Sequence, residues 1–173
     1  VDDGAARHIA GMAIPALSLP STGGGSVDLA SWARSGLVLY VFPRMGPTEI
    51  PDPPGWIAIP GAYGCTQQSC AFRDRQARFH ELGYLVAGLS AQPLDEQREA
   101  HVRLHLSFPL LADPGRQLGR VLGLPTFSVG DMTLYRRLTL VTAAGRIAKV
   151  FYPVFPPDEN AEEVLTWLER RPK

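Results

Sequence analysis

The sequence has few cysteines, no excess of charge of either sign and no long apolar run. Seventeen basic residues balance seventeen acidic ones among 173 residues, so the chain has no electrostatic footprint for nucleic acid or an anionic membrane surface. No apolar run approaches the ~20 residues that a membrane-spanning helix needs. Nucleic-acid and membrane partners are therefore not expected.

The chain holds only two cysteines, Cys65 and Cys70. Two cysteines do not make the disulfide framework of a small secreted protein, and a close pair is more typical of catalytic or redox-sensing thiols. We therefore expect a cytoplasmic protein. The length, with 45% hydrophobic and 20% charged residues, is typical of one globular domain that spans residues 1–173.

Both cysteines lie in the stretch Gly64–Asp74, which follows a loop rich in proline and glycine and leads into a helical pattern. Phe72 and Phe79 recur on one face of this helix until Gly83 ends it. Cys65 is therefore expected at the start of a helix, where free backbone N–H groups and the positive end of the helix dipole stabilise a thiolate. Such a sulfur is a nucleophile near neutral pH.

The spacing of the two cysteines does not fit a disulfide inside an intact helix. Five residues along a helix separate the Cα atoms by about 8 to 9 Å, whereas a disulfide tolerates at most about 7 Å. A bond between them requires the start of the helix to unwind, and residues 66–69 carry little apolar anchoring against this. The alternative is that both cysteines are small buried hydrophobes, which Gly64 and the four polar residues 66–69 argue against.

Hydrophobic periodicity predicts alternating strands and helices. The apolar run 37–42 is typical of a strand that is buried on both faces. Leu17–Leu19 and Val27–Leu29 are expected to pair as a hairpin around a triple glycine. The other expected elements are strands at 84–89, 108–112, 133–142 and 147–154, the last two as a hairpin, and helices at 30–33, 94–106 and from 160 to 170. This order predicts an α/β fold with a central mixed sheet covered by helices on both faces.

Two helix starts are expected from capping residues. Asp113 is a candidate N-cap because Pro114 follows it at the first helical position, and this helix is expected to end at Gly123. Asn160 or Asp158 is expected to cap the final helix.

A long loop, Pro43–Gly64, precedes the cysteine helix. Its six prolines and four glycines among 22 residues leave too few N–H donors for regular structure. A loop of this length beside a reactive site is usually functional. Trp56, Ile57 and Ile59 are expected to fold back over apolar surface, and the alternative interpretation is a packed Ω-type excursion without a role of its own.

The sequence offers no metal site. His101 and His105 stand four residues apart on an expected helix, the spacing that two ligands on one helix face would use. No third ligand is placed near them, so we expect neither a metal nor another cofactor.

Arg136 and Arg137 stand inside an expected apolar strand, where a charge is costly without a partner. Alternation places one of them outward and one inward. The inward arginine is a candidate to face Cys65 and to stabilise its thiolate. In the alternative interpretation both arginines only solvate an edge strand.

The stretch Gly64–Asp74 reads Gly-Cys-Thr-x-x-x-Cys-x-Phe-Arg-Asp. This motif resembles that of the peroxiredoxins, most closely the atypical two-cysteine Q-type class related to bacterioferritin comigratory protein. The likeness extends from about Ala13 to Leu168 and implies a thioredoxin-like fold with an N-terminal hairpin extension and, at 44–63, an inserted proline-rich active-site loop.

The resemblance implies roles for individual residues. Cys65 corresponds to the peroxidatic cysteine, Cys70 to the resolving cysteine that forms an intramolecular disulfide with it, and Arg137 to the active-site arginine. Pro43 fits the family proline ahead of the site, with Thr66 as a candidate to orient the substrate.

The sequence also departs from the family pattern. Pro43 precedes Cys65 by 22 residues, 15 more than in the family, and Ala62 stands where the family has threonine. Thr48 is a candidate to replace that threonine. A second extension, Ser128–Leu134, lies just before the arginines.

The function that the resemblance implies is a thiol peroxidase that reduces hydrogen peroxide and organic hydroperoxides. Its partners would be the peroxide and a thioredoxin-type reductant, and the protein would be a monomer or a weak dimer. Two alternatives stay open. One is a thiol–disulfide oxidoreductase, although such enzymes normally have two residues between their cysteines, not four. The other is a redox sensor without peroxidase turnover.

Overall fold

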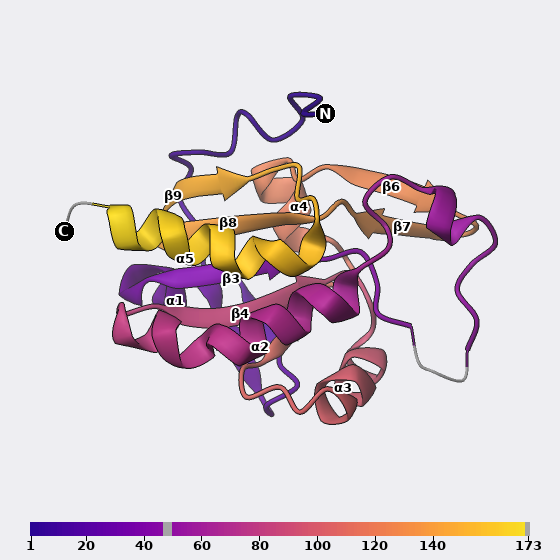
Figure 1. The fold of residues 1–173 in the computed structure, drawn as a ribbon, viewed down its shortest axis with the longest axis horizontal. Helices are drawn as coiled ribbons and strands as arrows, with labels where there is room; N and C mark the ends of the chain where they lie inside the picture. The colour runs from indigo at the N-terminus through magenta and orange to yellow at the C-terminus, as the bar shows by residue number, and fades with distance from the viewer. Residues whose placement is uncertain (47–49, 172–173) are drawn as a thin grey trace.

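The computed structural model describes residues 1–46 and 50–171. In this part of the chain, a mixed sheet of five strands in the order β5-β4-β3-β8-β9 forms the centre (Figure 1). The central strand β3 is parallel to β4 and antiparallel to β8. The strands of this sheet are β3 (Leu37–Val41), β4 (Leu85–Ser90), β5 (Leu110–Ala112), β8 (Leu138–Ala143) and β9 (Arg146–Phe151). The expected mixed sheet is confirmed.

Helices cover both faces of this sheet because β3 is apolar on both. Val38 and Tyr40 belong to the core under α2 and α5, whereas Leu39 and Val41 belong to the core on the opposite face. In Figure 1, α2 and α5 lie side by side in front of the sheet, and α1 and α4 lie behind it. The helices are α1 (Leu29–Ser35), α2 (Cys65–Glu81), α3 (Leu94–Arg103), α4 (Gln117–Leu122) and α5 (Asn160–Arg170), with 3-10 turns η1 (Trp56–Ala58) and η2 (Pro157–Glu159). None of the helices in the described ranges is both long and apolar enough to cross a membrane.

Two antiparallel hairpins lie outside the central sheet. The N-terminal hairpin, β1 (Ser18–Pro20) with β2 (Ser26–Asp28), is the one expected from the sequence. The other pairs β6 (Thr126–Val129) with β7 (Met132–Tyr135). The expectation of one continuous strand over 133–142 is therefore wrong. The chain leaves the hairpin at Arg136 and enters the central sheet at Leu138, because residues 132–135 pair with β6 and not with β9.

Asp113 stabilises the start of α4 from farther away than expected. The helix begins at Gln117, and Pro114 lies in the preceding turn. The Asp113 carboxylate still accepts the backbone N–H groups of Gln117 (2.8 Å) and Leu118 (3.1 Å). It also accepts the Tyr135 hydroxyl (2.7 Å), so the carboxylate joins α4 to β7.

Two other helix ends differ from expectation. Neither Asn160 nor Asp158 caps α5: the helix follows Glu159 without a side-chain cap, and the Asn160 side chain is buried instead. α3 ends at Arg103, so His105 lies beyond it with a left-handed backbone (φ 52°) and does not share a helix face with His101. Within the described ranges, no group of three or more His, Cys, Asp or Glu residues is placed to hold a metal ion.

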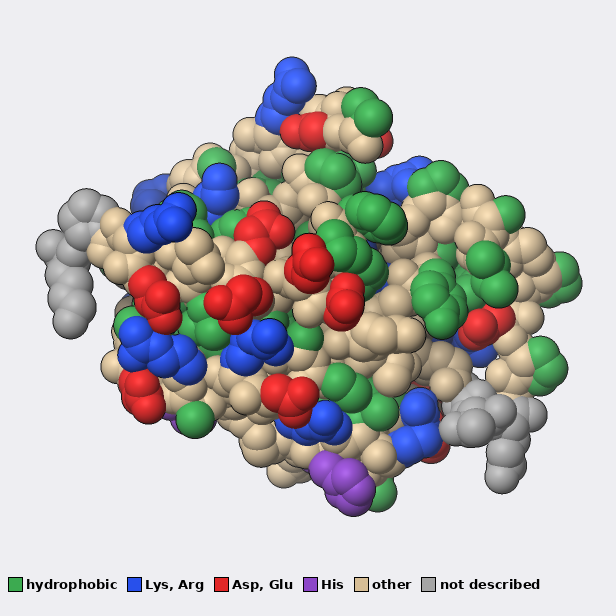
Figure 2. All heavy atoms as spheres, viewed as in Figure 1, with side chains coloured by type: hydrophobic (Ala, Val, Ile, Leu, Met, Phe, Trp, Pro, Cys, Tyr) green, Lys and Arg blue, Asp and Glu red, His purple; other side chains and the backbone are tan. Residues whose placement is uncertain are grey.

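The exposed face of α2 and α5 carries acidic and basic side chains next to one another (Figure 2). Arg75 pairs with Glu162, and Arg78 pairs with Glu169, each at 3.0 Å. Such exposed pairs contribute only about 0 to 1 kcal/mol. The contact between the two helices therefore depends mainly on the apolar core beneath them.

Gly88 in β4 leaves room for side chains of the core below α2, and a larger residue at this position is expected to destabilise the protein. A Cβ atom at this position would lie 2.6 Å from Leu110 Cδ2 and 2.7 Å from Tyr40 Cζ. Overpacking of this kind costs about 1–3 kcal/mol, and we expect Gly88→Ala to lower the free energy of unfolding by that amount in urea denaturation. Gly115→Ala is the matched control, because a Cβ there would meet Gln117 Cγ only at 3.8 Å. Equal losses in the two variants would contradict this account.

Candidate active site

Cys65 is the first residue of α2, and the residue before it must be glycine. Gly64 has a left-handed backbone (φ 108°), and a Cβ atom there would lie 2.6 Å from Pro157 Cγ. A side chain at this position would therefore be strained and would also clash with η2. Among the described residues no side chain caps α2, so an anion can bind at its first-turn N–H groups.

Arg137 lies against the Cys65 sulfur. Its Nη2 is 3.1 Å from Cys65 Sγ, and each of the two residues is only 3% exposed. The neighbouring Arg136 is half-buried and lies over the Phe127 ring at 5.6 Å. The structure thus brings the inward arginine and the cysteine together, as alternation along the sequence suggested.

Oxygen atoms also hold the two terminal nitrogens of the Arg137 guanidinium, whereas its buried Nε has no hydrogen-bond partner among the described residues. Nη2 also donates to the carbonyl oxygens of residues 61, 62 and 63 at 3.2 to 3.3 Å, and Nη1 donates to Gln68 Oε1 at 2.6 Å. Of these partners only the sulfur can carry a full negative charge. A buried cation is stable only beside compensating groups, and the Cys65 sulfur is one of those groups here.

Gln68 and Asn160 belong to the site although sequence reasoning did not identify them. Gln68 Nε2 donates to Asn160 Oδ1 at 3.0 Å, and Thr139 Oγ1 donates to the same oxygen at 2.7 Å. Helical spacing carried a signal, since Gln68 lies four residues before the buried Phe72 and therefore on the same face. No pattern in the sequence predicts the hydrogen bond between Gln68 and Asn160.

The start of α2 is anchored more firmly than the sequence indicated. Besides Gln68, Ser69 is fully buried, and its hydroxyl accepts a hydrogen bond from Tyr40 at 2.9 Å. Burial raises the pKa of Tyr40 far above its ordinary value, so the phenol stays protonated and remains a donor. The expectation that residues 66–69 carry little apolar anchoring did not include these buried hydrogen bonds.

Cys70 is half-buried in the same unbroken helix, and both cysteines are free thiols. The helix rise and radius place their Cα atoms about 8 to 9 Å apart. The structure therefore represents the protein with its thiols reduced.

A cavity of about 290 Å³ lies over Cys65. Thr66 is one of the residues that line it. Pro43 is buried, its carbonyl accepts the Ser90 hydroxyl at 3.1 Å, and it is not among the lining residues. Thr48 lies outside the described residues. The lining residues are Arg44, Met45, Gly46, Asp52, Trp56, Ala62, Tyr63, Gly64, Cys65, Thr66 and Gln67.

The inserted loop forms the outer wall of this cavity. Arg44 pairs with Asp52 at 3.0 Å and lies over the Trp56 ring at 5.9 Å. Trp56 is 4% exposed, and Ile59 is partly buried beside it. Ile57 is 80% exposed, so the expectation that it folds back over apolar surface is wrong. The η1 turn directs Trp56 inward and Ile57 outward.

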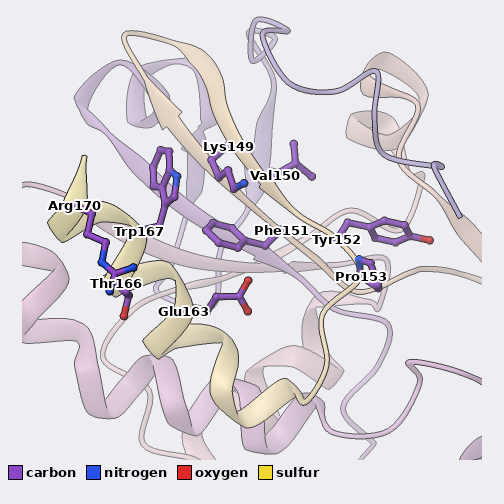
Figure 3. A pocket seen from close by; sticks show the side chains of 9 residues that line it. All are labelled: Lys149, Val150, Phe151, Tyr152, Pro153, Glu163, Thr166, Trp167 and Arg170. Carbon is purple, nitrogen blue, oxygen red and sulfur yellow. The ribbon is translucent and has the colours of Figure 1, made fainter. Parts of the chain in front are cut away.

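A larger cavity of about 420 Å³ lies between β9 and α5 (Figure 3). Phe151 and Trp167 meet edge to face there at 6.3 Å, and Lys149 lies over the Phe151 ring at 5.5 Å. Neither cysteine lines it, whereas Cys65 lines the cavity of about 290 Å³. The cavity over Cys65 is therefore the candidate active site.

Comparisons with known proteins place the chain in a family. Residues 9–165 match the Redoxin family. The chain is similar to the chloroplastic Peroxiredoxin Q of Populus jackii, with 28% identity over 92% of this chain and 67% of the relative. It is also similar to that of Suaeda salsa, with 26% identity over 90% of this chain and 65% of the relative. The chain thus spans about two thirds of the length of these relatives.

Solved structures share the fold. Peroxidoxin BcpB from Mycobacterium tuberculosis superposes with a TM-score of 0.75 and 22% identity, over 95% of this chain and 99% of the other. Peroxiredoxin Q from Xanthomonas campestris superposes with a TM-score of 0.74 and 22% identity over the same shares. With its thioredoxin-like fold, the chain belongs to the Redoxin family and is a peroxiredoxin similar to those of the Q type.

Proposed function

We propose that this protein is a thiol peroxidase that reduces hydrogen peroxide and organic hydroperoxides. The observation that carries the proposal is the contact of 3.1 Å between Arg137 Nη2 and Cys65 Sγ at the start of α2. The guanidinium and the helix N-terminus together stabilise a thiolate. The same donors can stabilise charge that develops on a substrate oxygen.

In the first step the Cys65 thiolate attacks one oxygen of the peroxide. The S–O bond forms as the O–O bond breaks, and the cysteine becomes a sulfenic acid. The leaving hydroxide or alkoxide takes up a proton and departs as water or alcohol. Arg137, the N–H groups of the first turn of α2 and the Thr66 side chain orient the peroxide. In this proposal Pro43 shapes the turn that leads into the inserted loop, and Thr48 keeps the role expected from the sequence.

In the second step Cys70 attacks the oxidised sulfur. Its thiol condenses with the sulfenic acid of Cys65, a disulfide forms and water is released. A dithiol protein of the thioredoxin type then reopens the bond by thiol–disulfide exchange and is itself oxidised. Neither step requires a metal or an organic cofactor.

The alternative is a thiol–disulfide oxidoreductase or a redox sensor on the same fold. The position of Cys65 in the wall of a concave pocket favours the peroxidase, because small-molecule sites are typically concave. Sustained peroxide consumption with thioredoxin recycling separates the first function from the other two.

The compartment and the assembly stay predictions. We expect a cytoplasmic protein that is a monomer or a weak dimer, whereas the plant relatives are named as chloroplastic.

Substitutions of the two cysteines are expected to block different steps of the reaction. Cys65→Ser abolishes peroxide consumption, because no other thiol in the chain contacts Arg137. Cys70→Ser still forms one sulfenic acid per chain, which dimedone labelling and mass spectrometry detect, but thioredoxin no longer supports turnover. Peroxidase turnover in Cys65→Ser would refute the assignment.

Arg137 is expected to govern the first step. Removal of a preorganised donor at a reacting centre slows a reaction by about 10²- to 10³-fold, so Arg137→Met should lower the second-order rate constant with hydrogen peroxide by about that factor in stopped-flow experiments. Arg136→Met is the matched control, since this arginine lies over Phe127 and does not contact the sulfur. A similar loss in both variants would show that general charge, and not this contact, matters.

Trp56 is expected to select for organic peroxides. Its ring lines the cavity over Cys65, so Trp56→Ala should lower kcat/KM for cumene hydroperoxide by about tenfold or more while changing that for hydrogen peroxide little. Ile57→Ala, at the exposed neighbouring position, should change neither. Equal effects of Trp56→Ala on the two peroxides would mean that the inserted loop does not contact the substrate.

A further inference from the structure

Disulfide formation between Cys65 and Cys70 requires part of α2 to open. Both residues lie in one continuous helix, where their Cα atoms are about 8 to 9 Å apart, and a disulfide tolerates at most about 7 Å. The rate of the second step therefore depends on the free energy needed to unwind the first turns of α2. This dependence rests on the proposed function, because the opening matters only if the disulfide forms.

The first turns of α2 are held mainly by buried hydrogen bonds to other elements. Side-chain capping is absent from this helix start, and no acidic residue lies in its first turn. Instead the fully buried Gln68 and Ser69 bond outward, Ser69 to Tyr40 on β3 and Gln68 to both Arg137 and Asn160. Any opening of residues 65–69 has to break these contacts.

The Asn160 side chain accepts hydrogen bonds from residues on two different elements. Its Oδ1 receives Gln68 Nε2 from α2 and Thr139 Oγ1 from β8, whereas its Nδ2 has no acceptor within the described part of the chain. The bond to Thr139 fixes the start of α5 to the central sheet. The bond to Gln68 then fixes the start of α2 to α5.

η2 adds a steric contact at the same place. A Cβ atom on Gly64 would lie 2.6 Å from Pro157 Cγ, so the proline ring packs directly on the backbone that leads into Cys65. The segment 157–160 thus contacts both the residue before Cys65 and the buried side chain three residues after it.

We propose that Asn160 is a positioning residue that keeps the start of α2 closed and thereby sets how fast Cys70 reaches oxidised Cys65. In the closed helix the sulfenic acid stays beside Arg137, where a second peroxide molecule can oxidise it to a sulfinic acid and leave as water or alcohol. In the opened helix the Cys70 thiol attacks the Cys65 sulfur, the S–O bond breaks and water is released. The hydrogen bond between Gln68 and Asn160 therefore biases the partition between these two fates.

Asn160→Ala tests this proposal. Loss of one typical buried hydrogen bond corresponds to about a two- to tenfold change in an equilibrium, so the variant should form the disulfide about two- to tenfold faster after one equivalent of hydrogen peroxide. The yield of sulfinic acid under excess peroxide, measured by mass spectrometry, should fall correspondingly. The rate of the first step, followed by stopped-flow fluorescence, should change less than the rate of the second.

Thr139→Val is the matched control. It removes the other hydrogen bond to the same Asn160 oxygen without touching α2, so it should lower stability while leaving the ratio of the two rates close to that of the wild type. Pro157→Ala, which removes ring atoms from Gly64, should change the ratio in the same direction as Asn160→Ala and provides an independent variant if that protein does not fold.

The outcomes separate the two proposals. If the wild-type protein consumes peroxide and forms the disulfide, but Asn160→Ala and Pro157→Ala leave the ratio of the rates unchanged, the role of Asn160 is overturned and the peroxidase remains. If Thr139→Val changes the ratio of the two rates as much as Asn160→Ala does, Asn160 has only a structural role. If wild-type protein forms no disulfide between Cys65 and Cys70, the proposed second step fails and this inference fails with it.

Discussion

The structure of this site depends on a buried guanidinium in contact with a sulfur atom. Arg137 is almost inaccessible to water. Its partners come from the inserted loop and from α2, where they are the Gln68 and Cys65 side chains. A cation in such a place is tolerated only while all of these groups surround it. The loop, the helix start and the beginning of β8 must therefore be correctly placed at the same time, and each depends on the other two.

In the proposed reaction, Gln68 links the geometry of attack on the peroxide to the opening of α2 that the second step requires. Its oxygen accepts from Arg137 and its nitrogen donates to Asn160, so one amide orients the guanidinium and ties α2 to α5. Tighter bonding at this amide improves the arrangement for the first step and opposes the opening required for the second. The Gln68 side chain therefore has opposite effects on the two proposed steps.

The sequence predicted the elements whose signal is local. The apolar run of β3, the glycine before Cys65 and the start of α2 depend on neighbouring residues, and the motif around the cysteines located the site. Alternation predicted that one of Arg136 and Arg137 faces Cys65, and the resemblance named Arg137, although the strand expected there is divided between two sheets. In each of these cases the information lies within a few residues of the feature.

The features that sequence reasoning missed depend on contacts between distant segments. Asn160 was expected to cap a helix because asparagine is common at that position. Its buried Oδ1 instead accepts hydrogen bonds from Gln68 and Thr139, which lie on other elements. Asp113 likewise caps α4 across a turn that Pro114 and its neighbours form, a geometry that residue type alone does not specify. Thr48, the candidate for the missing family threonine, lies outside the described residues.

The two extensions relative to the family pattern share a small apolar core of their own. Trp56 and Ala62 of the inserted loop pack with Val129 and Leu134 of the β6–β7 hairpin, and the Trp56 and Phe127 rings lie 6.2 Å apart. The inserted loop and the hairpin bury these apolar side chains against each other, so each stabilises the conformation of the other. In evolution as in protein engineering, the pair would have to be gained, trimmed or transplanted together, because a chain that kept only one would expose its apolar side to solvent.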